Sequence, residues 1–236
     1  MIRQLIAAEF YKVRRKGFWF LTFLGPFGVV ALQMVNYGVR KDYLLQISDD
    51  HWRDYLENVS SFTPLALILG IVILTSLLAS VEDETNAWKQ IMAFPVSKLS
   101  VYLAKMSMLL GFLFLSCILL TLWTWGYGVF LQLDGPIPYG LMLQHGFYPF
   151  FAALPVLALH LWLTTVSRNQ GLPITIGIMG VVFAFMPYAL PDWMIWKWPL
   201  LQNAWQEPLL NVGLGLIAGA ALYLAGMLDF KRRDVK

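Results

Sequence analysis

The chain has 236 residues, of which 58% are hydrophobic and 13% are charged, and its formal net charge is +3. This composition leaves too little polar surface for a soluble globular domain, and no charge block or low-complexity tract indicates a disordered tail. The single cysteine, Cys117, excludes an internal disulfide, and we interpret it as a small packing residue.

Six long apolar runs follow one another along the chain. Each is close to the roughly 20 residues that a helix needs to cross a hydrocarbon core about 30 Å thick. The runs cover residues 18–37, 62–81, 106–131, 146–166, 172–190 and 209–228. The sequence therefore predicts an all-α integral membrane protein with six transmembrane helices, built as a single domain over residues 1–236.

Lysine and arginine are divided unevenly between the segments that connect these runs. The termini and the loops after the second and fourth runs carry 13 basic and six acidic residues, and the other loops carry four basic and eight acidic residues. Because positively charged segments stay in the cytoplasm, we expect both termini to be cytoplasmic and loops 38–61 and 191–208 to face outward. The resulting net charges, +7 inside and −4 outside, report membrane orientation and do not indicate nucleic-acid binding.

The segment before the first run has its own helical pattern. Ile2, Leu5, Ile6, Phe10 and Val13 recur at helical spacing, and the basic residues lie largely away from this stripe. This predicts an interfacial elbow helix within residues 1–17 at the inner membrane surface. Anchoring to anionic headgroups would be sufficient to explain such a helix, and contact with a partner protein is the alternative.

Two outer loops are rich in aromatic residues. In loop 38–61, apolar residues at i, i+3, i+4 and i+7 from Trp52 predict a second interfacial helix, and loop 191–208 has the composition of a hairpin that dips into the outer leaflet. Aromatic residues at headgroup depth often only anchor a protein, and the alternative is a vestibule that contacts a substrate. The candidate residues for a substrate site or outer gate are Trp52, Tyr55, Trp193, Trp196, Trp198 and Trp205.

Within the six runs, ionisable side chains are almost absent. No Asp, Glu, Lys or Arg falls inside them, whereas ion-coupled carriers usually need a buried charge near the middle of the membrane. His160 is the exception, and we expect it to form a hydrogen bond across a helix interface rather than to relay protons. Pro26, Pro155 and Pro187 should bend their helices, and Gly215 with Gly219 should permit a close helix crossing.

Enzyme motifs are also missing from the sequence. The chain contains no His-Glu-x-x-His, no nucleophile elbow and no Gly-x-x-x-x-Gly-Lys-Ser/Thr phosphate loop. We therefore expect no catalytic activity, cofactor or metal in this chain, and any ATP would have to be bound by another chain.

The first inner loop, residues 82–105, has the most specific pattern in the sequence. Asp83 and Glu84 suit the N-terminus of a short helix, and Pro95 would stop that helix. Ser97 would cap a second helix that leads into the third run. A stiff amphipathic element of this kind can transmit force between a soluble motor and the membrane, and a solvated connector is the alternative.

This loop resembles the inner loop of ABC-2-type transporter permeases. In that family an acidic residue ends the second span, an amphipathic coupling helix follows, and a Pro-Val-Ser-Arg/Lys turn leads to a lysine, here Lys105. The sequence Trp88-Lys89-Gln90 is most similar to the branch that serves lantibiotic immunity and bacitracin resistance, although Asn86 stands where many relatives have glycine. Residues 9–15 and 230–235 also resemble the ends of these permeases.

The resemblance implies a permease subunit of an ATP-binding cassette exporter in the bacterial cytoplasmic membrane. Its implied partners are cytoplasmic ATPases, which bind ATP and Mg²⁺, and a second permease that is identical or similar. Its implied substrate is an amphipathic antimicrobial peptide, and the alternative is a sensor or interaction subunit that docks on an ATPase without transport. The residues implied in coupling to the ATPase are Glu82, Trp88, Lys89, Pro95, Ser97, Lys98 and Arg168.

Overall fold

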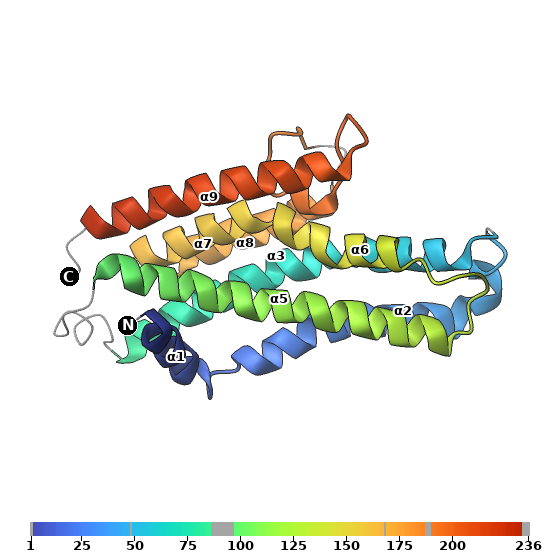
Figure 1. The fold of residues 1–236 in the computed structure, drawn as a ribbon, viewed down its shortest axis with the longest axis horizontal. Helices are drawn as coiled ribbons and strands as arrows, with labels where there is room; N and C mark the ends of the chain where they lie inside the picture. The colour runs from blue at the N-terminus through green and yellow to red at the C-terminus, as the bar shows by residue number, and fades with distance from the viewer. Residues whose placement is uncertain (1, 48, 86–96, 168, 187–189, 233–236) are drawn as a thin grey trace.

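The computed structural model of the chain describes residues 2–47, 49–85, 97–167, 169–186 and 190–232. Within these residues the regular elements are helices, which confirms the all-α prediction. They are α1 (Ile2–Val13), α2 (Phe18–Leu44), α3 (His51–Thr85), α5 (Lys98–Phe130), α6 (Tyr139–Ala152), α7 (Leu154–Val166), α8 (Gly171–Ala184), the short 3₁₀ helix η2 (Trp198–Leu200) and α9 (Pro208–Arg232). The long helices run side by side, and α1 lies at the same end of the molecule as the C-terminal end of α9 (Figure 1).

The expected elbow helix is present as α1. Val13 is fully buried, and Leu5, Ile6 and Phe10 are partly buried, so the apolar stripe faces the protein. The chain then turns into α2 at Gly17, whose φ of 82° lies in the left-handed region that glycine adopts without strain. Because of this turn, α1 lies across the end of the bundle where α3 ends and α5 begins (Figure 1).

Five helical runs in the described part of the chain are long and apolar enough to cross a membrane. They are α2, α3, α5, the α6–α7 pair and α9. The expected fifth span, residues 172–190, contains α8, which has only 14 residues. At about 1.5 Å of rise per residue α8 is about 21 Å long, shorter than a hydrocarbon core of about 30 Å. A complete sixth crossing and the cytoplasmic position of the termini therefore stay predictions.

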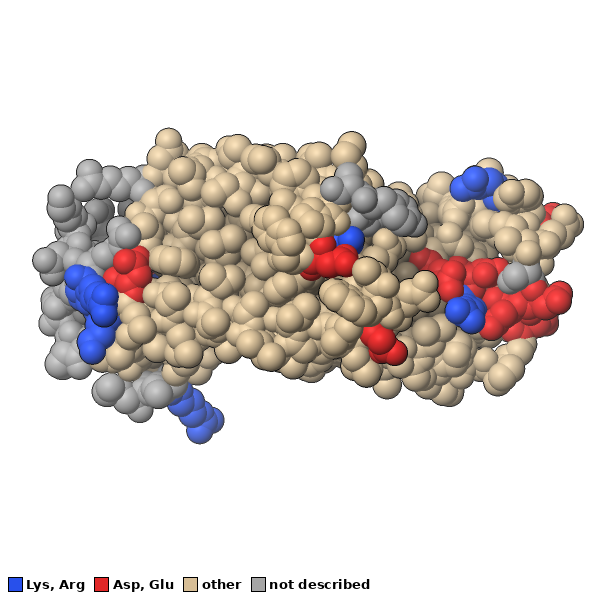
Figure 2. All heavy atoms as spheres, turned by 90° about the horizontal axis from the view of Figure 1, so that it is seen from above, with Lys and Arg blue, Asp and Glu red and all other residues tan. Residues whose placement is uncertain are grey.

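The outer surface of the helices is apolar, as a lipid-facing surface should be. Phe20 of α2 is 65% exposed and Ile217 of α9 is 72% exposed. Figure 2 shows charged side chains gathered at the two ends of one face, with a long uncharged surface between them and a smaller charged group partway along. A soluble protein would not expose this much contiguous apolar surface, so the arrangement fits a multi-pass membrane protein.

The predicted outer loop 38–61 is wrong in its extent. α2 continues to Leu44 and α3 begins at His51, so only a short connection separates the two helices. The stripe that starts at Trp52 is helical, as predicted, but it forms the first turns of α3 and is buried against α2 and α5. An amphipathic stripe looks the same in sequence whether its partner is a membrane surface or another helix, and here the partner is protein.

Local features of the later helices agree with the sequence in most places. The fourth run is broken between α6 and α7, with Pro155 in the first turn of α7. Gly215 and Gly219 lie where α9 crosses the α6–α7 junction: a Cβ built on Gly215 would be 2.6 Å from Cα of Ala152. The helical backbone of α2 continues through Pro26 and departs from helical geometry at Arg40 instead. Pro187 is outside the described residues.

Candidate functional site

Charged side chains from three helices meet inside the end of the bundle that carries α1. Lys105 of α5 is fully buried, Glu82 of α3 is 2% exposed and Glu9 of α1 is 4% exposed. The Lys105 ammonium forms an ion pair with Glu82 and lies 3.6 Å from Oε2 of Glu9. Lys12, one turn along α1, donates a 2.7 Å hydrogen bond to the other carboxylate oxygen of Glu9. We call these four residues the inner charge cluster.

The structure describes three of the residues expected to couple to an ATPase. Glu82 belongs to the inner charge cluster, so its carboxylate faces the protein interior and is not presented to a docking partner. Ser97 caps α5 as predicted, because its hydroxyl accepts the backbone N–H of Ser100 at 3.1 Å. Lys98 is the first residue of α5 and is partly buried. Trp88, Lys89, Pro95 and Arg168 lie outside the described residues, so the coupling helix stays a prediction.

Sequence reasoning missed Lys105 and Glu9 as members of this site. Both residues stood out only as parts of a family pattern, and Glu9 was expected to contribute to a surface helix. A usable signal was present, because an acid at the end of the second run and a lysine at the start of the third have opposite charges on neighbouring helix ends. That α1 supplies the second carboxylate depends on the turn at Gly17, which residue spacing does not reveal.

At the other end of the bundle, two of the predicted aromatic residues are inside the protein. Trp52 is 3% exposed, and Tyr55 is fully buried and donates a 3.0 Å hydrogen bond to the carbonyl of Thr124 on α5. Gln33 of α2 adds a 3.0 Å bond to the carbonyl of Asn58 on α3. Trp52 and Tyr55 therefore hold α2, α3 and α5 together and have no surface to offer a substrate in this structure.

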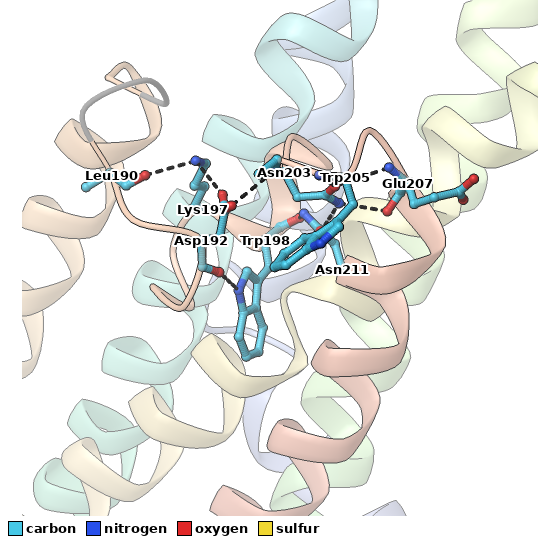
Figure 3. A network of polar contacts seen from close by, with 9 residues as sticks. Leu190, Asp192, Lys197, Trp198, Asn203, Trp205, Glu207 and Asn211 are labelled. Atoms are coloured by element: carbon cyan, nitrogen blue, oxygen red, sulfur yellow. Dashed lines mark hydrogen bonds and ion pairs between the residues drawn. The ribbon is translucent and has the colours of Figure 1, made fainter.

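The segment between α8 and α9 is folded onto the bundle by a polar network (Figure 3). Lys197 donates to Asp192 at 2.7 Å and to the carbonyl of Leu190 at 2.9 Å, and Trp198 donates its indole N–H to the carbonyl of Asp192 at 2.7 Å. Asn211 of α9 donates to the carbonyl of Trp198 at 3.1 Å. Asn203 also donates to the side chain of Asn211, so the network ties residues 190–207 to the first turn of α9 (Figure 3).

The carboxylate of Asp192 is the centre of this network. Besides the bond from Lys197, its second oxygen accepts the backbone N–H of Ala204 at 3.1 Å. Both donors favour the ionised form, so first the side-chain bond from Lys197 and then the bond from Ala204 lower the pKa of Asp192. One acidic side chain thereby joins the start and the end of the segment.

The four tryptophans of this segment differ in how far their side chains are exposed. Trp193 is 74% exposed and Trp205 is 65% exposed, whereas Trp198 is buried. Trp196 is partly buried and packs against Phe183 of α8, with ring centroids 6.4 Å apart. Figure 1 shows that the segment lies beside the long helices partway along the bundle, and not at the far end where α2 meets α3. Exposed aromatic rings partway along the bundle can contact lipid or bind an amphipathic molecule.

An apolar cavity of about 470 Å³ opens between α2, α3 and α5. Small residues leave room for it, and nearly all of its wall is hydrocarbon. Its polar side chains are those of Thr63 and Ser116, with Cys117 close by. The cavity can accept an apolar chain but offers no charged group to a ligand.

His160 is completely buried where α7 faces α3 and α8. A Cβ built on Gly177 of α8 would be 3.0 Å from its Cε1 atom. Neither ring nitrogen has a hydrogen-bond partner among the described residues, so the expected bond across a helix interface is not found. Within the same residues, no group of three or more His, Cys, Asp or Glu side chains is placed to hold a metal ion.

Together, the apolar helices, the elbow helix and the inner charge cluster define a multi-pass helical membrane protein in which three helices share buried charges at one end. Residues 5–184 match the family model described as ABC-2 family transporter protein, and the chain belongs to this family. The match includes residues 5–13 of α1 and the whole loop that follows α3. No curated protein and no solved structure shows a significant match to the chain. Family membership makes the protein a membrane component of a transporter that associates with an ABC ATPase.

Proposed function

We propose that this chain is the permease subunit of an exporter that removes amphipathic antimicrobial peptides, of the lantibiotic or bacitracin type, from the bacterial cytoplasmic membrane. Partner ATPases bind ATP and Mg²⁺ on the cytoplasmic side, and a second permease, identical or similar, completes the pathway. Peptide moves outward, and the result is resistance or immunity.

The observation that carries the substrate class is the ordered segment between α8 and α9. It exposes Trp193 and Trp205 on a backbone fixed by the Asp192 network, and the side chain of Asn203 accepts the backbone N–H groups of both Trp205 and Glu207. Exposed aromatic rings in a segment that also carries the acidic residue Glu207 suit a molecule that is both apolar and positively charged. The apolar cavity between α2, α3 and α5 is compatible with the apolar part of such a molecule.

The experiment is reconstitution of the full chain with its ATPase in liposomes, with bacitracin and a cationic lantibiotic as the probes. We expect at least one peptide to stimulate ATP hydrolysis and to be depleted from the membrane while ATP is present. Binding of both peptides without depletion would instead identify a sensor. If the peptides neither stimulate ATP hydrolysis nor bind, the proposed substrate class is contradicted.

Variants test the segment itself. Trp193→Ala with Trp205→Ala should lower the peptide stimulation, because both exposed rings are removed while the buried Trp198 keeps the segment in place. The matched control is Trp125→Ala, which removes a 41% exposed tryptophan from α5. Equal effects of the two changes would show that the α8–α9 segment has no special part in recognition.

A further inference from the structure

The inner charge cluster joins the two ends of the inner loop to the elbow helix. Glu82, at the start of the inner loop as defined from the sequence, lies in the last turn of α3, and Lys105, at the end of that loop, lies two turns into α5. Glu9 comes from α1, so one ammonium group contacts carboxylates from the two other helices.

Stability alone is a poor explanation for such a cluster. Removing charges from water costs several kcal/mol per ion, and well-packed neutral residues in place of a buried ion pair are often as stable or more stable. The arrangement of the four charges is nevertheless balanced, with two carboxylates and two ammonium groups, so no charge is left without a counterion. What the cluster supplies is a fixed mutual position for three helix segments.

Apolar packing also attaches α1 to the bundle. Val13 is fully buried in the same core as Phe112, and the ring of Phe10 lies 5.1 Å from that of Phe112 and beside Gly111. Ring contacts of this kind tolerate sliding, whereas paired charges in a dry interior resist separation because each would be left buried without a partner.

We propose that Lys105 is a positioning residue that fastens the elbow helix to the ends of α3 and α5, so that these three segments move as one body when an ATPase displaces the inner loop. Glu82 then acts in coupling from the inside, through Lys105 and Glu9, and not by touching the ATPase. This inference rests on the proposed function, because it names the internal part of the same coupling site.

The first test is Glu9→Gln in the full complex with its ATPase. This change leaves the buried Lys105–Glu82 pair intact and removes only the contribution of α1, so the chain should fold. We expect less peptide exported per ATP hydrolysed, together with faster amide exchange in α1 and unchanged exchange in α3 and α5. The melting temperature of the variant is measured as well. If it is unchanged, a lower ratio of transport to hydrolysis cannot be explained by general destabilisation.

Two further variants separate charge from packing. Glu9→Gln, Glu82→Gln and Lys105→Met together remove all three buried charges, and we expect a folded but poorly coupled protein. Lys105→Arg keeps the charge and should retain most of the coupling. The control is Arg53→Gln with Glu57→Gln, which removes an exposed ion pair within α3 and should leave the ratio unchanged.

A wild-type ratio of transport to hydrolysis in Glu9→Gln, or in the folded triple variant, would overturn the inference while the proposed function stands. Loss of coupling in Lys105→Arg as severe as in the triple variant would also overturn it, because the charge would not be the decisive property. If the wild-type complex itself shows no ATP-driven export, the proposed function fails and takes this inference with it.

Discussion

Single side chains with several polar contacts fix the one long irregular segment that the structure describes. One carboxylate oxygen of Asp192 accepts a hydrogen bond from Lys197, and the other accepts the backbone N–H of Ala204. A charged residue near the start of the α8–α9 segment therefore fixes the position of residues near the end of the segment. Irregular backbone beside apolar helices needs this internal satisfaction, because a loop without regular structure must otherwise turn its polar groups to water.

The lowered pKa of Asp192 predicts a pH-dependent contribution to stability. A carboxyl whose pKa is lower in the folded state stabilises that state above its unfolded pKa of about 3.9, and loses this effect as the pH falls through the folded value. We therefore expect Asp192→Asn to lower the melting temperature at pH 7, and the difference from wild type to shrink below about pH 4. Thermal unfolding in detergent across this pH range measures it.

The control for this prediction is Asp42→Asn, which changes an exposed carboxylate near the end of α2. It should shift the melting temperature little at any pH in the series. A deficit in Asp192→Asn that stays constant down to pH 3 would mean that the shape of the side chain, and not its charge, holds the segment.

At the scale of helices, α9 crosses the α6–α7 junction at close range. A Cβ on Gly219 would lie 2.7 Å from Cβ of Leu154 and 3.2 Å from the backbone nitrogen of Pro155. Backbone atoms cannot turn aside as a flexible side chain can, so the helices would have to separate. Without a hydrophobic force between helices in lipid, such close contact is a principal source of association.

Gly219→Ala should accordingly destabilise the protein by about 1–3 kcal/mol, the usual cost of forcing extra atoms into a packed interface. The matched control on the same helix is Gly213→Ala, since nothing lies within 4 Å of a Cβ at that position. That change should stabilise by up to about 1 kcal/mol, because alanine favours a helix more than glycine does. Equilibrium unfolding of both variants in the same detergent gives the comparison, and equal effects would rule out the tight crossing.

The elements were predictable where a single requirement dictates the sequence. Crossing a bilayer needs a long apolar run, so five spans and a helix before the first of them could be predicted from the residues. A bend at Pro155 was also predicted, but the division of the fourth run into α6 and α7 was not. The extent of α2 and α3 could not be predicted from the sequence. The turns around Trp52 have an amphipathic pattern that fits either a membrane surface or a protein partner. Only the folded chain shows that α2 and α5 cover that face.

The same reason limits what the sequence says about the site. Ser97 could be assigned as a helix cap because a cap acts within a few residues of itself. The pairing of Glu82 with Lys105 and Glu9, and the burial of Trp198 beside the exposed Trp193, depend on contacts between distant segments. Residue type identified these positions as unusual, and packing decided which of them face inward.

At the scale of the whole molecule, the short length of α8 affects how deep in the membrane the residues after it lie. A helix about 21 Å long ends inside a hydrocarbon core of about 30 Å if it starts at the inner surface. The segment that follows carries Asp192, Lys197 and Glu207, and irregular backbone is tolerated at membrane depth only where protein or water surrounds it. We therefore expect water to reach residues 190–207 from outside.

Cysteine labelling tests this arrangement together with the orientation. In a Cys117→Ala background, a membrane-impermeant maleimide applied to intact cells should label Asp49→Cys in the α2–α3 connection and Trp205→Cys in the α8–α9 segment. Lys231→Cys, at the end of α9, should react only after the cells are permeabilised, because the excess of basic residues predicts that this end is cytoplasmic.

The three positions give distinguishable outcomes. Labelling of Lys231→Cys in intact cells, or of Asp49→Cys only after permeabilisation, would reverse the predicted orientation and place the inner charge cluster outside, away from any ATPase. If Asp49→Cys labels and Trp205→Cys does not in either condition, the orientation holds but the α8–α9 segment is sealed from water. Its charges would then need cover from a second permease, because lipid cannot solvate Asp192, Lys197 and Glu207.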